Sequence, residues 1–223
     1  MTAVVDPVAA HVAELDRVLR GPGAVKRSMI AEVRNGLHDA AEAYREGGLD
    51  PQQAADSAVQ DFGPAREVAP LMQEELTARQ GRRTALLVAV VFPVMLLGWD
   101  LLWQTGHGWT APVPDATRVL SRVLDIGTVV IAAAALVLLL ATFRRAVSRR
   151  LTVLAGLVAA GGVLWCNGIA AVMNLINPQR AGAMLTIEPA VTAVALASTA
   201  VSALVVRSGI RALRVARAAG RQR

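Results

Sequence analysis

Residues 79–103 read RQGRRTALLVAVVFPVMLLGWDLLW. Between Thr84 and Trp103 the only charged residue is Asp100, and three arginines stand directly before this run: Arg79, Arg82 and Arg83. A helix needs about 20 mainly apolar residues to cross the roughly 30 Å hydrocarbon layer of a membrane. Arginines that flank such a run mark its cytoplasmic side. The stretch therefore predicts a first membrane-spanning helix over about residues 84–104.

Charge is divided unevenly along the 223-residue chain. Residues 1–83 hold thirteen acidic and ten basic side chains, net −3, whereas residues 84–223 hold four acidic and thirteen basic ones, net +9. A basic protein can bind nucleic acid. Here the excess arginines lie at the ends of apolar runs, where topology and anionic lipid headgroups account for them. We therefore expect membrane lipids as partners and no direct binding of nucleic acid.

Three further apolar runs predict spanning helices over about residues 119–142, 151–173 and 190–206. Thirteen arginines flank the span ends that face the N-terminal region, and three flank the opposite ends: Arg118, Arg122 and Arg180. This asymmetry predicts that both termini lie in the cytoplasm. An even number of spans, four, returns the chain to its starting side. We therefore expect a multi-pass protein of the cell inner (plasma) membrane.

The N-terminal region, residues 1–80, shows the apolar periodicity of one-sided helices. Two helices are predicted over about residues 5–19 and 24–44, with Gly21-Pro22-Gly23 between them. A third is expected to begin at Pro51, capped by Asp50, because aspartate before proline is a common helix start.

The third helix is expected to end at Phe62-Gly63, and a fourth to begin at Pro64 and continue towards the membrane. Pro70 is a candidate for a bend in it. No strand-like alternation is present. The predicted fold class is therefore all-α: a small cytoplasmic head of about four helices, residues 1–80, followed by a four-helix transmembrane bundle over residues 81–206.

Part of the head resembles two related families. Residues 32–40 read EVRNGLHDA, and a Gly-Gly turn, Ala54-Ala55, Phe62-Gly63 and Val68-Ala69 follow. Over roughly residues 10–78 this arrangement resembles the alpha-helical signalling domain associated with helix-turn-helix regulators (HAAS-like) and the permease prefix domain 1 family of bacterial, largely actinobacterial, membrane proteins. The resemblance implies a cytoplasmic regulatory or docking head, whose partner would be a PadR-like regulator or a transporter. It implies no catalytic residues.

Three polar residues inside the predicted spans are candidate functional groups: Asp100, Asp125 and Asn167. An acid within a span is by default a functional-site hypothesis. One interpretation gives the aspartates an ion, proton or ligand role, and the other places them near the outer interface, paired with Arg118 or Arg122. For Asn167 a hydrogen bond to a neighbouring helix is the simpler interpretation, typically worth about 0.6 kcal/mol. Close packing of helix backbones is likewise expected at four glycines of the third predicted span: Gly156, Gly161, Gly162 and Gly168.

The C-terminal tail, residues 207–223, repeats arginine at spacings of 4, 3, 3 and 4: Arg207, Arg211, Arg214, Arg217 and Arg221. These spacings place the five side chains on one helical face. One interpretation is a cationic amphipathic helix that contacts lipid headgroups on an anionic leaflet. The other is a topology signal at the end of the last span with a frayed terminus.

No motif indicates an enzyme. HExxH, GxxxxGK[ST] and GxSxG are absent, and Cys166 is the only cysteine. We therefore expect no catalytic residues, cofactor or metal site. Three hypotheses remain: a regulatory or docking membrane protein, a small transporter or transporter subunit that uses intramembrane polar residues, and a structural assembly protein. The protein partner would be a transcription regulator, a permease or a second copy of the chain.

The predicted topology is testable with reporter fusions. A reporter that works only in the cytoplasm should be active when fused to either terminus, because the arginine distribution keeps both ends on that side. A reporter that works only outside should be active when fused after Gln104. Activity of the cytoplasmic reporter at one terminus and not the other would contradict the four-span prediction.

Overall fold

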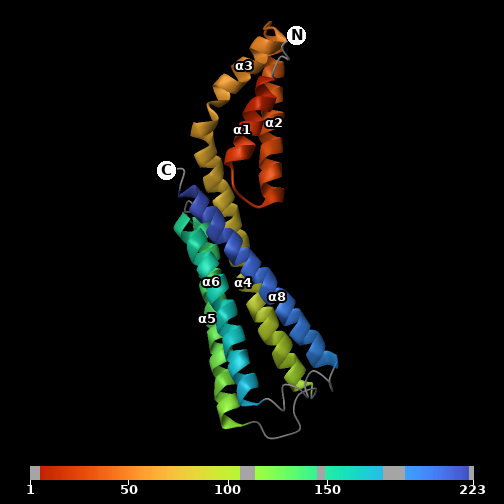
Figure 1. Ribbon diagram of the computed structural model, residues 1–223, viewed down its shortest axis with the longest axis vertical. Helices are drawn as coiled ribbons and strands as arrows, with labels where there is room; N and C mark the ends of the chain where they lie inside the picture. Colours follow the sequence, from red (N-terminus) through yellow and green to blue (C-terminus); the bar gives the residue numbers. More distant parts are fainter. Residues whose placement is uncertain (1–5, 106–113, 145–148, 178–188, 221–223) are drawn as a thin grey trace. The chain divides into compact units, whose positions relative to one another are not determined.

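The computed structural model describes residues 6–105, 114–144, 149–177 and 189–220, except the side chains of Trp103 and Arg144. Within these ranges the secondary structure is helical and no strand is present, so the all-α prediction is confirmed (Figure 1). Contacts divide the chain into two compact units. The first, called the head unit below, contains Met1–Gln80 and Arg214–Arg223, and the second, the span unit, contains Gly81–Leu213.

The head unit begins with α1 (Pro7–Val18), α2 (Gly23–Glu46) and α3 (Pro51–Phe62), and continues into the start of α4 (Ala65–Gln104). The boundaries of the first three helices lie close to the predicted ones where both are described. The predicted break at Gly21-Pro22-Gly23 separates α1 from α2, since α2 begins at Gly23.

Local caps account for these helix starts. The Asp50 carboxylate accepts hydrogen bonds from the backbone N–H groups of Gln52 and Gln53, both at 2.9 Å, and Pro51 occupies the first helical position, as predicted. Asp6 caps α1 in the same way, with its carboxylate 3.0 Å from the Val8 nitrogen. Both caps satisfy backbone donors that a helix leaves unpaired at its first turn.

The core of the head unit is formed mainly by apolar side chains from α1, α2 and the start of α4. Leu15 and Leu76 are fully buried, and Leu37 is 2% exposed. The cluster comprises Val8, Val12, Leu15, Leu19, Met29, Ile30, Leu37, Ala65, Ala69 and Leu76. Because Ala65, Ala69 and Leu76 belong to α4, the first turns of that helix are part of the core and not a free connector.

The span unit contains most of α4, together with α5 (Asp115–Arg144), α6 (Arg149–Ile176) and most of α8 (Pro189–Ala219). All four helices are long and apolar enough to cross a membrane, so the number of candidate spans among the described residues matches the four predicted. At a rise of about 1.5 Å per residue, α4 is about 60 Å long and α8 about 46 Å. Both exceed the roughly 30 Å hydrocarbon thickness, so each extends beyond it.

The fourth head helix is predicted to continue towards the membrane, and with the first span it forms one element, α4, which continues through both Pro70 and Pro93. A proline inside a helix removes one backbone hydrogen bond, and the helix can bend there without ending. The predicted tail from residue 207 is likewise continuous with the last span, since α8 extends to Ala219. Arg180 and Arg221 lie outside the described residues.

Glycines allow close approach at some positions of the span unit. A Cβ atom added to Gly162 would lie 2.8 Å from the Phe92 ring and 2.9 Å from Ile131, and Phe92 belongs to the buried core of this unit. Small residues at such contacts let helix backbones approach. The same role, expected for Gly161 and Gly168, is wrong within the described residues, since an added Cβ there meets no atom within 4 Å.

Replacing Asp50 with alanine should lower the free energy of unfolding of the head unit by about 1 kcal/mol, because two N-terminal amides of α3 lose their acceptor. Pulse proteolysis of the full chain in detergent across a urea series measures this. Asp56→Ala removes an exposed carboxylate inside the same helix and should leave the midpoint nearly unchanged. Equal losses from the two variants would contradict the capping role.

Candidate functional site

The predicted family residues Phe62 and Gly63 form the turn between α3 and α4. The Phe62 ring packs edge-on against the His11 ring of α1, with centroids 5.6 Å apart and an interplanar angle of 85°. Gly63 has φ 92°, a conformation that favours glycine. His11 is 7% exposed, and its Nε2 atom has no hydrogen-bond partner among the described residues. These residues therefore fix how α3 enters α4.

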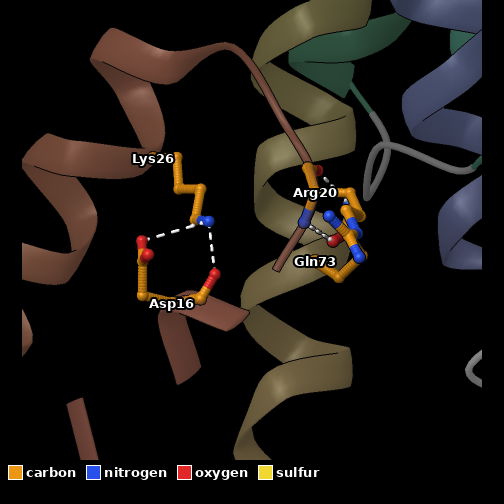
Figure 2. Close-up of polar contacts among 4 residues, drawn as sticks. All are labelled: Asp16, Arg20, Lys26 and Gln73. Carbon is orange, nitrogen blue, oxygen red and sulfur yellow. Dashed lines mark hydrogen bonds and ion pairs between the residues drawn. The ribbon is translucent and has the colours of Figure 1, made fainter. Parts of the chain in front are cut away.

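Gln73 of α4 holds the connection between α1 and α2. Its Oε1 atom accepts the Arg20 backbone N–H at 2.8 Å, and its Nε2 atom donates to the Arg20 carbonyl at 2.7 Å (Figure 2). Gln73 is fully buried. Next to it, the Leu76 side chain lies 3.4 Å from the position of an added Cβ on Gly21. One amide side chain thus satisfies both backbone groups of a residue that is distant in sequence.

A second polar contact closes the same connection from the other side. Lys26 of α2 places its Nζ atom 3.0 Å from the Asp16 carboxylate of α1, and Nζ also donates to the Asp16 backbone carbonyl (Figure 2). The Lys26 side chain is 19% exposed and that of Asp16 is 54% exposed, so water still screens the pair. Together with Gln73, this contact fixes the geometry of residues 16–26.

Tyr44 and Asp61 join α2 to α3. The Tyr44 hydroxyl donates a hydrogen bond to the Asp61 carboxylate. This hydrogen bond, and then the negative charge of Asp61, raise the pKa of Tyr44 above its ordinary value of 10.0, because both disfavour the phenolate. The contact therefore favours the protonated hydroxyl, which is the form that can donate to Asp61.

The two aspartates of the predicted spans, Asp100 and Asp125, both belong to the span unit. Asp100 is exposed near the end of α4, and its carboxylate accepts a hydrogen bond from the Gln104 amide at 2.6 Å. Asp125 of α5 is half-buried. Arg118 pairs with Asp115 at 3.0 Å. The expected pairing of Arg118 or Arg122 with the intramembrane aspartates stays a prediction.

Asn167 of α6 donates hydrogen bonds to residues other than these two aspartates. Its Nδ2 atom donates to the Val163 carbonyl within the same helix at 2.8 Å, and to the Ser202 hydroxyl of α8 at 3.4 Å. The second contact crosses to a neighbouring helix, which is the arrangement expected of a packing asparagine.

Small and polar residues draw three helices together where α4 enters the span unit. A Cβ added to Gly81 of α4 would lie 2.5 Å from the Thr152 hydroxyl of α6. The Thr84 hydroxyl lies 2.9 Å from that of Ser208 on α8. Thr84 and Thr152 are both fully buried. Any larger residue at position 81 would separate α4 from α6.

A glycine pair brings α6 and α8 together in the same region. A Cβ on Gly156 would lie 3.1 Å from the Gly209 carbonyl oxygen, and a Cβ on Gly209 would lie 3.1 Å from the Gly156 carbonyl. In the same unit, the Arg82 guanidinium carbon lies 5.0 Å from the centroid of the Phe143 ring of α5. We call the region formed by Gly81, Thr84, Thr152, Gly156, Ser208 and Gly209 the neck contact.

The predicted arginine face of the tail is present on α8. Its described members are all exposed: Arg207, Arg211, Arg214 and Arg217. Arg221 lies outside the described residues. The opposite face is buried, with Ala212 and Ala216 fully so and Val215 and Ala219 nearly so.

Sequence reasoning did not single out Gln73, Gly81, Thr84 or Gly209. One signal could have found two of them, since Gln73 and Thr84 are polar residues about three helical turns apart on one face of α4. Among the described residues no group of three or more His, Cys, Asp or Glu side chains could hold a metal ion. Cys166 is a free thiol within α6.

Comparison with known proteins adds no assignment: no protein-family model, no curated protein and no solved structure matches the chain.

Gln73→Leu should destabilise the head unit by about 2–4 kcal/mol, because the Arg20 backbone N–H and C=O would both lose their buried partner. Gln73→Glu keeps an acceptor for the Arg20 N–H but sets a buried carboxylate oxygen against the Arg20 carbonyl, so it should also destabilise the head unit. Pulse proteolysis of the full chain in detergent measures both. Glu74→Leu introduces the same side chain at the adjacent exposed position and serves as control. A loss after Glu74→Leu as large as after Gln73→Leu would contradict the specific role of Gln73.

Proposed function

We propose that this multi-pass membrane protein carries a cytoplasmic head that regulates or docks a protein partner. The partner would be a PadR-like transcription regulator or a transporter, as the resemblance of residues 10–78 implies. The protein would reside in the inner (plasma) membrane with both termini in the cytoplasm, consistent with the arginine distribution. A change in the packing of the spans would alter how the head presents its surface.

The observation that carries this proposal is the continuity of α4. One helix supplies Ala69, Gln73 and Leu76 to the head unit and Gly81 and Thr84 to the span unit. A rotation or axial shift of α4 at the neck contact would therefore also displace Gln73, and Gln73 holds the α1–α2 connection through two hydrogen bonds. A continuous helix is one physical path by which two such units can be coupled.

The exposed side of α2 supports docking by charge. Four acids at spacings of 7, 3 and 4 lie on one face of the helix and are exposed: Glu32, Asp39, Glu42 and Glu46. Glu42 pairs with Arg45 at 2.9 Å, and residues 1–83 carry a net charge of −3. The remaining acids of this face suit a partner with a basic surface. Complementary charge favours association rate and specificity more than raw affinity.

Transport is a second candidate, favoured by the half-buried carboxylate of Asp125 within the apolar helix α5 and by Asp100 in α4. Acidic side chains within a membrane can belong to an ion or proton path. Proteoliposomes containing the purified chain and an internal pH-sensitive dye would test this. A proton flux that disappears in Asp125→Asn, with normal insertion, would support transport in place of docking.

Docking predicts that the full chain, solubilised from its own cells after brief crosslinking, retains one abundant partner. Charge reversal of Glu32 and Asp39 to arginine should reduce recovery of that partner at least about tenfold, since like charges across an interface disfavour association. The control is Asp56→Arg with Asp50 intact, which reverses charge on α3. Recovery that is unchanged by the α2 variant, or reduced equally by the α3 variant, would contradict docking through α2.

A further inference from the structure

The last turns of α8 group with a different compact unit of the chain from the rest of that helix. Residues up to Leu213 group with the span unit, whereas Arg214–Arg223 group with Met1–Gln80 in the head unit. The helix itself is continuous from Pro189 to Ala219. A single helix thus belongs to the span unit as far as Leu213 and to the head unit over its last turns.

Burial within those last turns is confined to one face. Val215 is 5% exposed, Ala216 fully buried and Ala219 8% exposed, at spacings of one and three residues. Arg214 and Arg217 lie between or beside them in sequence and are exposed. Small apolar side chains that are removed from water on one helical stripe mark a helix packed against protein.

We infer that the last turns of α8 are a structural element of the head, so that two helices, α4 and α8, connect the span unit to it. The apolar face that a surface-lying amphipathic helix would insert into lipid is buried within the protein, in residues that group with the head unit. The arginine face is therefore left to contact the anionic leaflet by charge alone. This differs from an amphipathic membrane anchor, whose binding scales with the apolar area that it buries.

The neck contact gives this second connection a mechanical consequence. In the span unit α8 is held by Gly209 against Gly156 and by Ser208 against Thr84. Residues 214–219 follow on the same continuous helix. A displacement of α8 at Gly209 must therefore move Ala216 within the head. Relative motion of α4 and α8 would then strain the head through both helices, whichever partner it docks.

Hydrogen exchange of the full chain in lipid nanodiscs tests the inference. Ala216→Glu places a charge on the buried face and should raise amide exchange in residues 65–80 at least about tenfold, because exchange follows the local opening equilibrium. Arg217→Glu places the same residue at the adjacent exposed position and should leave that exchange unchanged. Exchange in residues 149–176 reports that the spans remain folded.

Truncation gives an independent measurement. A chain ending at Leu213 should show the same increase in residues 65–80, whereas a chain ending at Ala219 should behave as the full chain does. Unchanged exchange in both the Ala216→Glu variant and the Leu213 truncation would overturn the inference. Equal increases in Ala216→Glu and Arg217→Glu, which vanish in zwitterionic lipid, would assign the tail to the membrane surface and also overturn it. Neither result depends on recovering a docking partner.

Discussion

The architecture depends on the need of a polypeptide to pair every backbone amide and carbonyl inside lipid. A helix satisfies these groups internally, and a break within the hydrocarbon would leave them without partners. In α4 the hydrogen-bonded helix does not stop where the hydrocarbon begins but continues back through Gly81 and Gln80 to Ala65. The same element therefore serves as the first span and as a core helix of the head.

Polar residues on α4 give this helix a defined rotation about its axis. Gln73, Thr77 and Thr84 are all at most 2% exposed, which is costly unless each group is hydrogen-bonded. Gln73 pairs with the Arg20 backbone, the Thr77 hydroxyl donates to the Gln73 carbonyl, and Thr84 meets Ser208. Apolar contacts tolerate small rotations, whereas the pairs that Gln73 and Thr84 make with other segments do not. These two residues therefore set the register between α4 and its neighbours in each unit.

Local signals in the sequence predicted much of the fold. Asp50-Pro51 located a helix start, the apolar runs gave four spans, and Gly21-Pro22-Gly23 located a break. Contacts between distant residues had no local signal: Gln73 meets Arg20 across most of the head sequence, and the Gly156–Gly209 approach depends on tertiary packing. The same limit explains the error at Gly161, because glycine composition does not reveal which face of a helix meets another. The burial of Val215 and Ala216 depends equally on a fold that periodicity cannot specify.

The continuity of α4 across the membrane boundary is the central claim, and a distance between spin labels tests it most directly. Nitroxides are placed at the exposed positions Leu71 and Leu86, which both lie within α4, in a Cys166→Ala background in lipid nanodiscs. Pulsed dipolar spectroscopy should give one narrow distribution centred at about 22 Å between the two backbone sites, after correction for the label linkers. A broad distribution, or a centre shorter by about 5 Å or more, roughly one helical turn, would show a break between the head and the first span and would contradict the account.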